Sequence, residues 1–319
     1  MDAAQRIVHG VDRAHQRRPW IAFPYAVVKK FGDDQAGNLA ALVAYYGFFS
    51  LFPLMLVLVT VLGIVLQGNI ELQERIESSA LANFPVIGDE ISSNVHPLRG
   101  SGLALGIGIA LSLWAGLGVL KVMQTAMNTV WNVPYRYRPN FVRSILKAAI
   151  MLGVLGVLTL ASAAAGSVGA GSDNWVFGIV GIAISLLLNF VLFMLAFRIL
   201  TTEDVSWADV RPGAIAAAAA WTALQALGGY FVSNQLQGAS ETYGTFATVI
   251  GLLAWIYLGA QVTLLAAEMN VVKKRHLWPR AIVQPPLTDA DQRALTAYAK
   301  QEERRPEEEI EVRINDQPS

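Results

Sequence analysis

Ionisable and amide side chains interrupt two of the most apolar stretches of this 319-residue sequence. These side chains belong to Lys121, Gln124, Asn128, Gln261, Glu268 and Asn270. The first three recur at intervals of three and four residues, and Gln261 and Glu268 are seven apart, so each set shares one helix face. Ionisable groups inside a membrane cost roughly 2.5–3.5 kcal/mol each and usually face a partner or a wet cavity. We therefore predict that the two faces line a substrate pathway, with Lys121 near Glu268.

A plainer interpretation of the same residues stays open. In it, the long side chain of Lys121 extends to the cytoplasmic headgroups of the membrane. Glu268 then takes part in a hydrogen bond inside the helix bundle. The two interpretations differ in whether the lysine and the glutamate are neighbours.

A third polar group lies early in another apolar stretch, AYYGFFSLFPLMLVLVTVLGIVLQ, which covers residues 44–67. Pro53 has no backbone N–H, and its ring presses on the carbonyl of Phe49, so we expect a kink that acts as a hinge. Lipid does not satisfy a freed carbonyl. We therefore add Tyr45, Tyr46 and Ser50 to the pathway candidates. The alternative is a structural kink with tyrosines in an interfacial aromatic belt.

A basic segment, VPYRYRPNFVRSILK, follows the second apolar stretch. We predict that its cations bind anionic lipid headgroups; they are Arg136, Arg138, Arg143 and Lys147. No carboxylate occurs from Ile91 to Ser172, so these cations have no acidic partner nearby in sequence. Aromatics interleaved with arginine also occur in nucleic-acid binders. Basic residues at the inner face of a membrane explain the pattern without nucleic acid, so no nucleic-acid partner is expected.

Six apolar segments must position these groups, at about 39–66, 102–121, 145–168, 175–198, 212–232 and 245–271. Each reaches the roughly 20 residues that cross a hydrocarbon layer of roughly 30 Å. Only 15% of the chain is charged, against about 25% in a typical soluble domain. The sequence thus predicts an all-α polytopic membrane protein with six transmembrane helices over residues 39–271.

The two flanking regions are polar. Residues 1–38 alternate apolar and basic side chains, which predicts an amphipathic helix lying on the cytoplasmic surface. Asp33 or Asp34 offers an N-cap for the first membrane helix. We expect the polar residues 272–319 to form a disordered cytoplasmic tail. Lysine and arginine concentrate on alternate sides of the six segments, which predicts that both termini are cytoplasmic.

Several kinds of active site are excluded by the residues present. The chain has no cysteine, which excludes disulfides, thiolate metal sites and cysteine nucleophiles. Its four histidines are scattered, and no GxSxG, Walker or HExxH motif occurs. We therefore predict no catalytic residues, no metal site, no cofactor and no enzymatic activity.

Four stretches carry a resemblance that covers about residues 20 to 275. AYYGFFSLFPLMLVL, WNVPYRYRPNF, VSWADVRPGA and TYGTFATVIGLLAWIYLGAQVTLLAAEMN resemble the YihY/BrkB family of bacterial inner-membrane proteins. The resemblance implies six helices, cytoplasmic termini and a place in the bacterial inner membrane. Members have been labelled ribonuclease BN-like, and this sequence offers no recognisable nuclease site.

The predicted function is translocation of an amphiphilic anionic envelope component, such as a lipid or glycolipid precursor, with membrane lipids as partners. One alternative is a membrane-bound ribonuclease-like enzyme. It would need Mg²⁺ held by inner-side carboxylates, for which the candidates are Asp33, Asp34, Glu203, Asp204, Asp209 and Glu268. The other alternative is a non-transporting scaffold for envelope assembly, a homo-oligomer that associates through helices rich in small residues.

Overall fold

The computed structural model describes residues 10, 12–65, 102–169, 175–231 and 237–314, and within them it contains helices and no strand. The α-helices are α2 (Pro19–Asp33), α3 (Ala36–Val65), α6 (Gly102–Val130), α7 (Phe141–Gly169), α8 (Trp175–Leu200), α9 (Trp207–Phe231), α10 (Gln237–Lys274) and α11 (Asp289–Gln301). A 3-10 turn, Tyr135–Tyr137, lies between α6 and α7. Each of the six predicted apolar segments coincides with one of the long helices α3 and α6 to α10.

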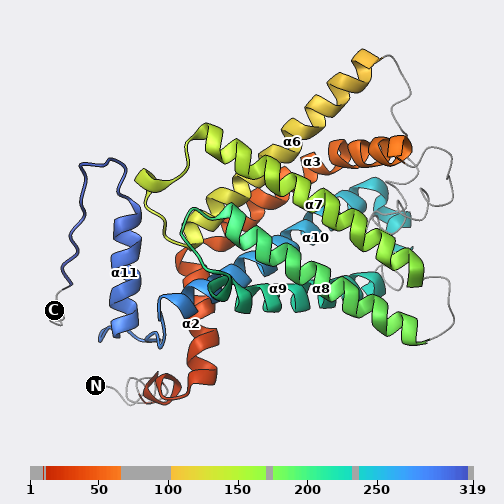
Figure 1. Ribbon diagram of the computed structural model, residues 1–319. Helices are drawn as coiled ribbons and strands as arrows, with labels where there is room; N and C mark the ends of the chain where they lie inside the picture. Colours follow the sequence, from red (N-terminus) through yellow and green to blue (C-terminus); the bar gives the residue numbers. More distant parts are fainter. Residues whose placement is uncertain (1–9, 11, 66–101, 170–174, 232–236, 315–319) are drawn as a thin grey trace.

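The long helices form a bundle that is apolar on its outside. Helix α3 packs along α6 and α10, α9 packs along α10, and α8 lies between α7 and α9 (Figure 1). Segments of α7, α8 and α10 within the described residues are long and apolar enough to cross a membrane: Phe141–Leu158, Ile179–Leu200 and Val249–Lys274. Apolar side chains of α8, such as Ile182 and Leu187, are about 60% exposed, as expected for a surface that faces lipid.

Small residues let α9 approach α10 closely. Ala214, Ala217 and Ala218 are buried, and a Cβ on Gly213 would overlap the carbonyl oxygen of Ala266 and the amide of Asn270. Helices in membranes associate through such small-residue contacts. The glycine is therefore needed for the backbones of α9 and α10 to meet.

The N-terminal region differs from the predicted surface helix. Helix α2 buries Ala22, Ala26, Val27 and Lys30, and it packs on α10, so only its other face is free to meet a membrane. Asp34 is not the N-cap of the first long helix; it is the C-cap of α2. The chain turns into α3 at Gln35, which has a φ of 51°. The prediction was wrong because the carboxylate of Asp34 has a cationic partner inside the bundle.

The prediction of a disordered tail is wrong for residues 272–314. Thr288 accepts a hydrogen bond from the N–H of Asp291, and the Asp291 carboxylate accepts one from the N–H of Thr288, which forms a capping box for α11. Ala290 and Ala294 lie on one side of this helix, and both are buried. Helix α11 stands beside α2 at one end of the bundle (Figure 1). The chain therefore closes that end with its own two flanking regions.

Candidate functional site

Three charged side chains meet inside this end of the bundle. Lys30, in the last turn of α2, donates hydrogen bonds to the Asp34 carboxylate and, at 2.7 Å, to the carbonyl oxygen of Val130, the last residue of α6. Its Nζ also lies 3.0 Å from Oε2 of Glu268 on α10. The side chains of Lys30 and Glu268 are fully buried, and that of Asp34 is 2% exposed. We refer to Lys30, Asp34 and Glu268 as the charge centre.

The carboxyl groups in this centre outnumber the cation. It holds two carboxyl groups and one ammonium group, so it is neutral only if one carboxyl keeps its proton. Removing an ion from water costs several kcal/mol, which only good pairing and hydrogen bonding repay. Simple packing would be served better by apolar side chains, so the centre is the strongest candidate for a functional site.

Tyr298 of α11 covers the charge centre from the tail side. Its ring lies against Lys30, with 5.8 Å from Nζ to the ring centroid, and its hydroxyl lies 3.4 Å from Oδ2 of Asp33. Burial, together with the negative charges of Asp34 and Asp33, raises the pKa of the Tyr298 hydroxyl, so it stays protonated and can donate. The tail thus contributes a side chain to the surroundings of Lys30.

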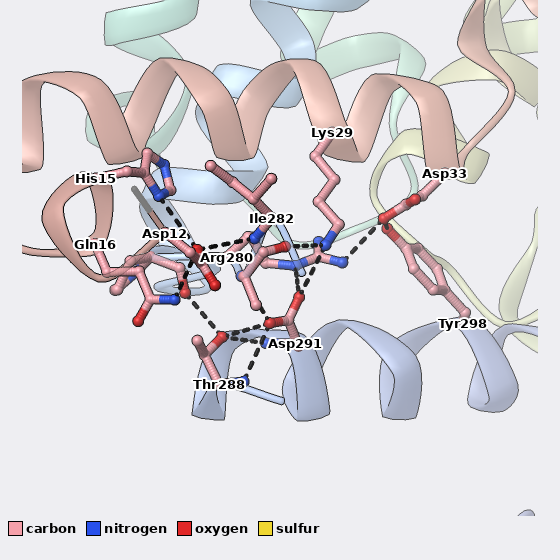
Figure 2. Close-up of polar contacts among 12 residues, drawn as sticks. Asp12, His15, Gln16, Lys29, Asp33, Arg280, Ile282, Thr288, Asp291 and Tyr298 are labelled. Carbon is pink, nitrogen blue, oxygen red and sulfur yellow. Dashed lines mark hydrogen bonds and ion pairs between the residues drawn. The ribbon is translucent and has the colours of Figure 1, made fainter. Parts of the chain in front are cut away.

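Asp291 is the hub of a second polar network (Figure 2). Its carboxylate accepts hydrogen bonds from Arg280 Nε, from the N–H of Ala281 at 2.9 Å and from Thr288 Oγ1 at 2.7 Å. Lys29 Nζ lies 3.4 Å away. Burial opposes ionisation of Asp291, but these hydrogen bonds outweigh it and lower the pKa of the carboxyl to about 2. Asp291 is therefore ionised at every physiological pH.

The same network joins the tail to α2. Arg280 donates to Asp33 at 3.0 Å, and Lys29 donates to the carbonyl of Ala281 at 2.6 Å. Farther out, the N–H of Ile282 donates to Asp12 at 3.0 Å (Figure 2). Two adjacent lysines of α2 thus serve two purposes: Lys29 holds the tail, and Lys30 enters the bundle.

The predicted pairing of Lys121 with Glu268 is wrong, because Glu268 pairs with Lys30. Helix α6 runs on to Val130, and the Lys121 ammonium lies over the ring of Phe141, the first residue of α7, at 4.5 Å. The Lys121 ammonium is therefore directed at the start of α7, and its extension to the cytoplasmic headgroups stays a prediction.

The amide side chains of the predicted pathway each bond to a different neighbour. Gln124 and Ser144 exchange hydrogen bonds between α6 and α7, at 2.9 and 2.8 Å. Asn128 accepts from the N–H of Thr202, and Asn270 accepts from the N–H of Gly213 at 2.6 Å. Gln261 donates to Tyr257 within α10. These bonds point to different neighbours, so the expected convergence of the amides on one pathway is not observed.

The polar groups of α3 have local contacts. The helix continues through Pro53, and Ser50 donates to the carbonyl of Gly47 at 3.0 Å. Tyr45 and Tyr46 are 56% and 42% exposed and lie edge to face. Exposed tyrosines agree with an aromatic belt, while the hinge at Pro53 stays a prediction.

The basic residues between α6 and α7 fall into two groups. Arg136 is paired with Glu303 of the tail at 2.9 Å, and Lys147 donates to the carbonyl of Thr201 at 2.8 Å. Arg138 lies over the ring of Tyr135 and donates to the carbonyl of Val133 at 3.2 Å, while Arg143 is exposed. Arg143 is therefore the most exposed of the four, and headgroup binding by these residues stays a prediction.

Sequence reasoning missed Lys30, Tyr298, Arg280 and Asp291 as site residues. One signal was present: Ala26, Val27 and Lys30 share a helix face, which places a lysine on the apolar side of α2. The segment TDAD at residues 288–291 also has the pattern of a capping box, with aspartate in the fourth position. Neither signal reveals which distant residue each side chain contacts.

Comparison with known proteins places these features in context. A family model described as "Virulence factor BrkB" matches residues 27–285, which include the charge centre and end before α11. Similar curated proteins include a "UPF0761 membrane protein" of Stenotrophomonas maltophilia (strain R551-3), 27% identical over 276 residues that cover 82% of this chain and 62% of that protein. This chain thus spans less than two thirds of that relative.

Two further relatives are covered over most of their length. The "Putative ribonuclease-like protein YfkH" of Bacillus subtilis (strain 168) is 26% identical over 264 residues, which cover 79% of this chain and 95% of that protein. The "Inner membrane protein YhjD" of Escherichia coli (strain K12) is 22% identical over 274 residues, which cover 79% and 81%. No solved structure matches the chain.

Proposed function

We propose that this chain, an integral membrane protein that belongs to the Virulence factor BrkB family, moves an anionic amphiphile across the bacterial inner membrane. The substrate class would be a lipid or glycolipid precursor of the cell envelope. Three kinds of observation support the proposal: the lengths of the helices, the position of the cations and the buried charge centre.

The topology proposed is six spans, α3 and α6 to α10, with both termini in the cytoplasm. The shortest of these helices, α9, has 25 residues and a length of roughly 37 Å, enough for a hydrocarbon layer of roughly 30 Å. Cations gather where α10 ends, at Lys273 and Lys274, and on the α6–α7 connection at Arg136 and Arg138. These segments contact the tail, so the positive-inside rule puts α2 and α11 on the cytoplasmic side.

The single observation that carries the transport proposal is the buried charge centre, in which one ammonium group faces two carboxyl groups. An ammonium group held between two carboxylates can exchange one of them for the headgroup of an anionic substrate. In this mechanism Lys30 binds the headgroup, Asp34 keeps the lysine in place, and Glu268 is the internal anion that the substrate displaces. Neutralisation of Glu268 by a proton would favour the exchange, because it weakens the attraction that holds Lys30.

The proposal assigns a recruiting role to the membrane-facing residues near the same end. Arg143 and Phe141 in the first turn of α7 are exposed, as is Tyr137 in the preceding connection; the two aromatic residues are 67% and 60% exposed. Exposed aromatic and basic side chains suit the headgroup level of a membrane, where they attract anionic lipids. Arg136, in the same connection, contacts the tail.

A flip assay on reconstituted protein tests this function. Proteoliposomes would carry a fluorescent phosphatidylglycerol, and a membrane-impermeant quencher would report its exchange between leaflets. We expect exchange above that of protein-free vesicles, a loss of about tenfold or more in Lys30→Gln, and near-normal exchange in the matched control Lys121→Gln. Equal rates in all samples and in empty vesicles would dispose of the transport proposal.

A ribonuclease-like activity is the second candidate, because the relative YfkH is named ribonuclease-like. Five of the six carboxylates considered for this activity are paired with cations: Asp33 with Arg280, Asp34 and Glu268 with Lys30, Glu203 with Arg275, and Asp209 with Lys274. The described residues hold no group of three or more histidine, aspartate or glutamate side chains suited to a metal. Cleavage of RNA by purified protein in the presence of Mg²⁺, lost in Asp209→Asn, would favour this candidate over transport.

The scaffold alternative makes a third, separate prediction. It requires that copies of the chain associate with one another, and it gives the charge centre no role in the function. Loss of envelope assembly on substitution of small helix-packing residues, with Lys30 and Glu268 freely replaceable, would favour it.

A further inference from the structure

We infer that residues 277–303, here called the gate segment, form a releasable cytoplasmic gate over the charge centre. The inference deepens the proposed function and rests on it, since a gate is useful only if something passes to Lys30 and Glu268. Its evidence is a set of contacts that the transport proposal does not use.

The gate segment is held at two sides of the bundle end. On the α2 side, Arg280 and Tyr298 reach Asp33, and Lys29 reaches Ala281 and Asp291 (Figure 2). On the opposite side the gate segment ends at the α6–α7 connection. There Asn132 donates to Gln301 at 2.9 Å, and the N–H of Arg136 donates to the carbonyl of Glu303 at 2.9 Å.

Between these two attachments the segment lies over Lys30. The ring of Tyr298 faces the ammonium group, and Lys30 is fully buried. The same lysine also bonds Val130, where α6 ends. A headgroup that comes from the cytoplasm therefore has to displace the gate segment to reach Lys30 from this side.

The type of contact suits release. Within α11 the buried apolar side chains are small, Ala290 and Ala294, so the apolar area that this helix removes from water is modest. The large apolar contacts of the gate segment lie at its start, where Leu277 is buried and the ring of Trp278 packs on Phe23. Beyond this start the attachments are charged and polar: the side chains of Arg280, Asp291 and Glu303 are almost fully buried. Such contacts respond to a change of charge, so the part from Arg280 onward can be released while Leu277 and Trp278 stay packed.

Helix α2 connects the gate segment with the charge centre. Lys29 and Lys30 are consecutive, and so are Asp33 and Asp34; the first of each pair holds the gate segment, and the second belongs to the centre. A shift in the last turn of α2 when Lys30 loses its attraction to Glu268 would therefore also disturb the Lys29 and Asp33 contacts. Loss of the Glu268 charge should open the gate.

Single-cysteine labelling measures this opening directly, because the chain contains no cysteine. The reporter is Ala294→Cys, at a position that is 0% exposed; the matched control is Leu295→Cys, the next residue of α11, which is 41% exposed. Full-length protein in lipid nanodiscs would be treated with a fluorescent maleimide at neutral pH. Each reporter would be combined with Glu268→Gln, with Arg280→Gln and with the surface control Arg304→Gln.

We expect the Ala294→Cys reporter to react at least about tenfold more slowly than the Leu295→Cys control in otherwise native protein, as a closed segment requires. Glu268→Gln and Arg280→Gln should each raise its rate several-fold, and Arg304→Gln should leave it unchanged. If Glu268→Gln damages the fold, labelling of the Leu295→Cys control would also change; Tyr298→Phe, which removes one hydroxyl, then supplies the milder test.

The gate would be overturned if the labelling rate of the Ala294→Cys reporter did not change in Glu268→Gln, Arg280→Gln or Tyr298→Phe. The gate segment would then be a fixed part of the fold. The labelling needs no substrate and no vesicle. Lipid exchange without gate movement would therefore leave the proposed function standing and remove this inference. Gate movement without lipid exchange would remove the proposed function and leave the movement of the gate segment standing.

Discussion

The charge centre predicts an asymmetry between two substitutions that remove one charge each. Lys30→Met leaves the carboxylates of Asp34 and Glu268 facing each other without a cation. Glu268→Gln leaves one ammonium and one carboxylate, a matched pair. The lysine substitution should therefore destabilise the protein more than the glutamate substitution, although Lys30 and Glu268 are equally buried.

The size of the difference follows from burial. Lys30 and Glu268 are 0% exposed and Asp34 is 2% exposed, so removing one partner of this buried set should cost about 3–5 kcal/mol for Lys30→Met. Glu268→Gln leaves the buried Lys30–Asp34 pair intact, so its cost should stay near about 1 kcal/mol. We thus expect a gap of at least about 2 kcal/mol.

Equilibrium unfolding in mixed detergent micelles measures both values through the fluorescence of the eight tryptophans. Lys121→Met is the matched control, a lysine of the bundle whose ammonium lies over Phe141, and it should cost less than about 1 kcal/mol. Equal costs for Lys30→Met and Glu268→Gln, or a larger cost for Glu268→Gln, would refute this reasoning. Glu268 would then be needed for the stability of the charge centre as much as Lys30 is.

Three further predictions concern residues around the centre. The carboxyl of Asp291 has a pKa of about 2 in the folded protein and about 4 when unfolded. Above pH about 5, the free energy of unfolding of the wild type should therefore exceed that of Asp291→Asn by about 2 kcal/mol. That advantage should shrink as the pH falls from about 4 toward 2, which urea titrations at several pH values would show; a constant difference would contradict it. Gly213→Ala should prevent the close contact between α9 and the turn of α10 that contains Asn270, and so reduce the monodisperse fraction in size-exclusion chromatography. A native elution profile would contradict this, because it would mean that α9 and α10 can move apart without destabilising the protein. Arg136→Ala should cost only about 0.5–1 kcal/mol in the same unfolding assay, because the Arg136 side chain is 20% exposed and Glu303 keeps the hydrogen bond from the N–H of Ile310. A cost above about 2 kcal/mol would contradict that assignment.

The helices could be predicted from the sequence because membrane-length apolar runs leave few other structures. The six expected segments coincide with α3 and α6 to α10, and α6 differs mainly in running on to Val130. The polar residues on those helices were predicted to line a pathway, and four of them, Gln124, Asn128, Glu268 and Asn270, are buried. The hydrogen-bond partners of these residues were not predicted. A hydrogen bond such as that from the N–H of Gly213 to Asn270 depends on how two helices pack, and the periodicity of the sequence does not encode this packing.

The charge centre could be predicted only in part. Glu268 was identified from its cost inside a membrane, and the same reasoning gave it the nearest lysine among the apolar segments, Lys121. Its real partner, Lys30, belongs to a helix that was expected to lie on the membrane surface. The tail was expected to be disordered because its composition is polar, yet Arg280 and Asp291 satisfy one another inside the fold. Composition cannot tell such internal pairing from solvation.

The bond from Lys29 to the carbonyl of Ala281 joins residues 252 positions apart, and it sets an order of events during biogenesis. At roughly 5–20 residues per second, a ribosome needs roughly 10 to 50 seconds to make the intervening chain. Throughout that interval the newly made N-terminal helix waits without its final neighbours. A transcript broken near its 3′ end would yield a polypeptide with every long helix inserted and this last closure missing. That unfinished end would be a means by which cellular proteases distinguish incomplete copies from complete ones.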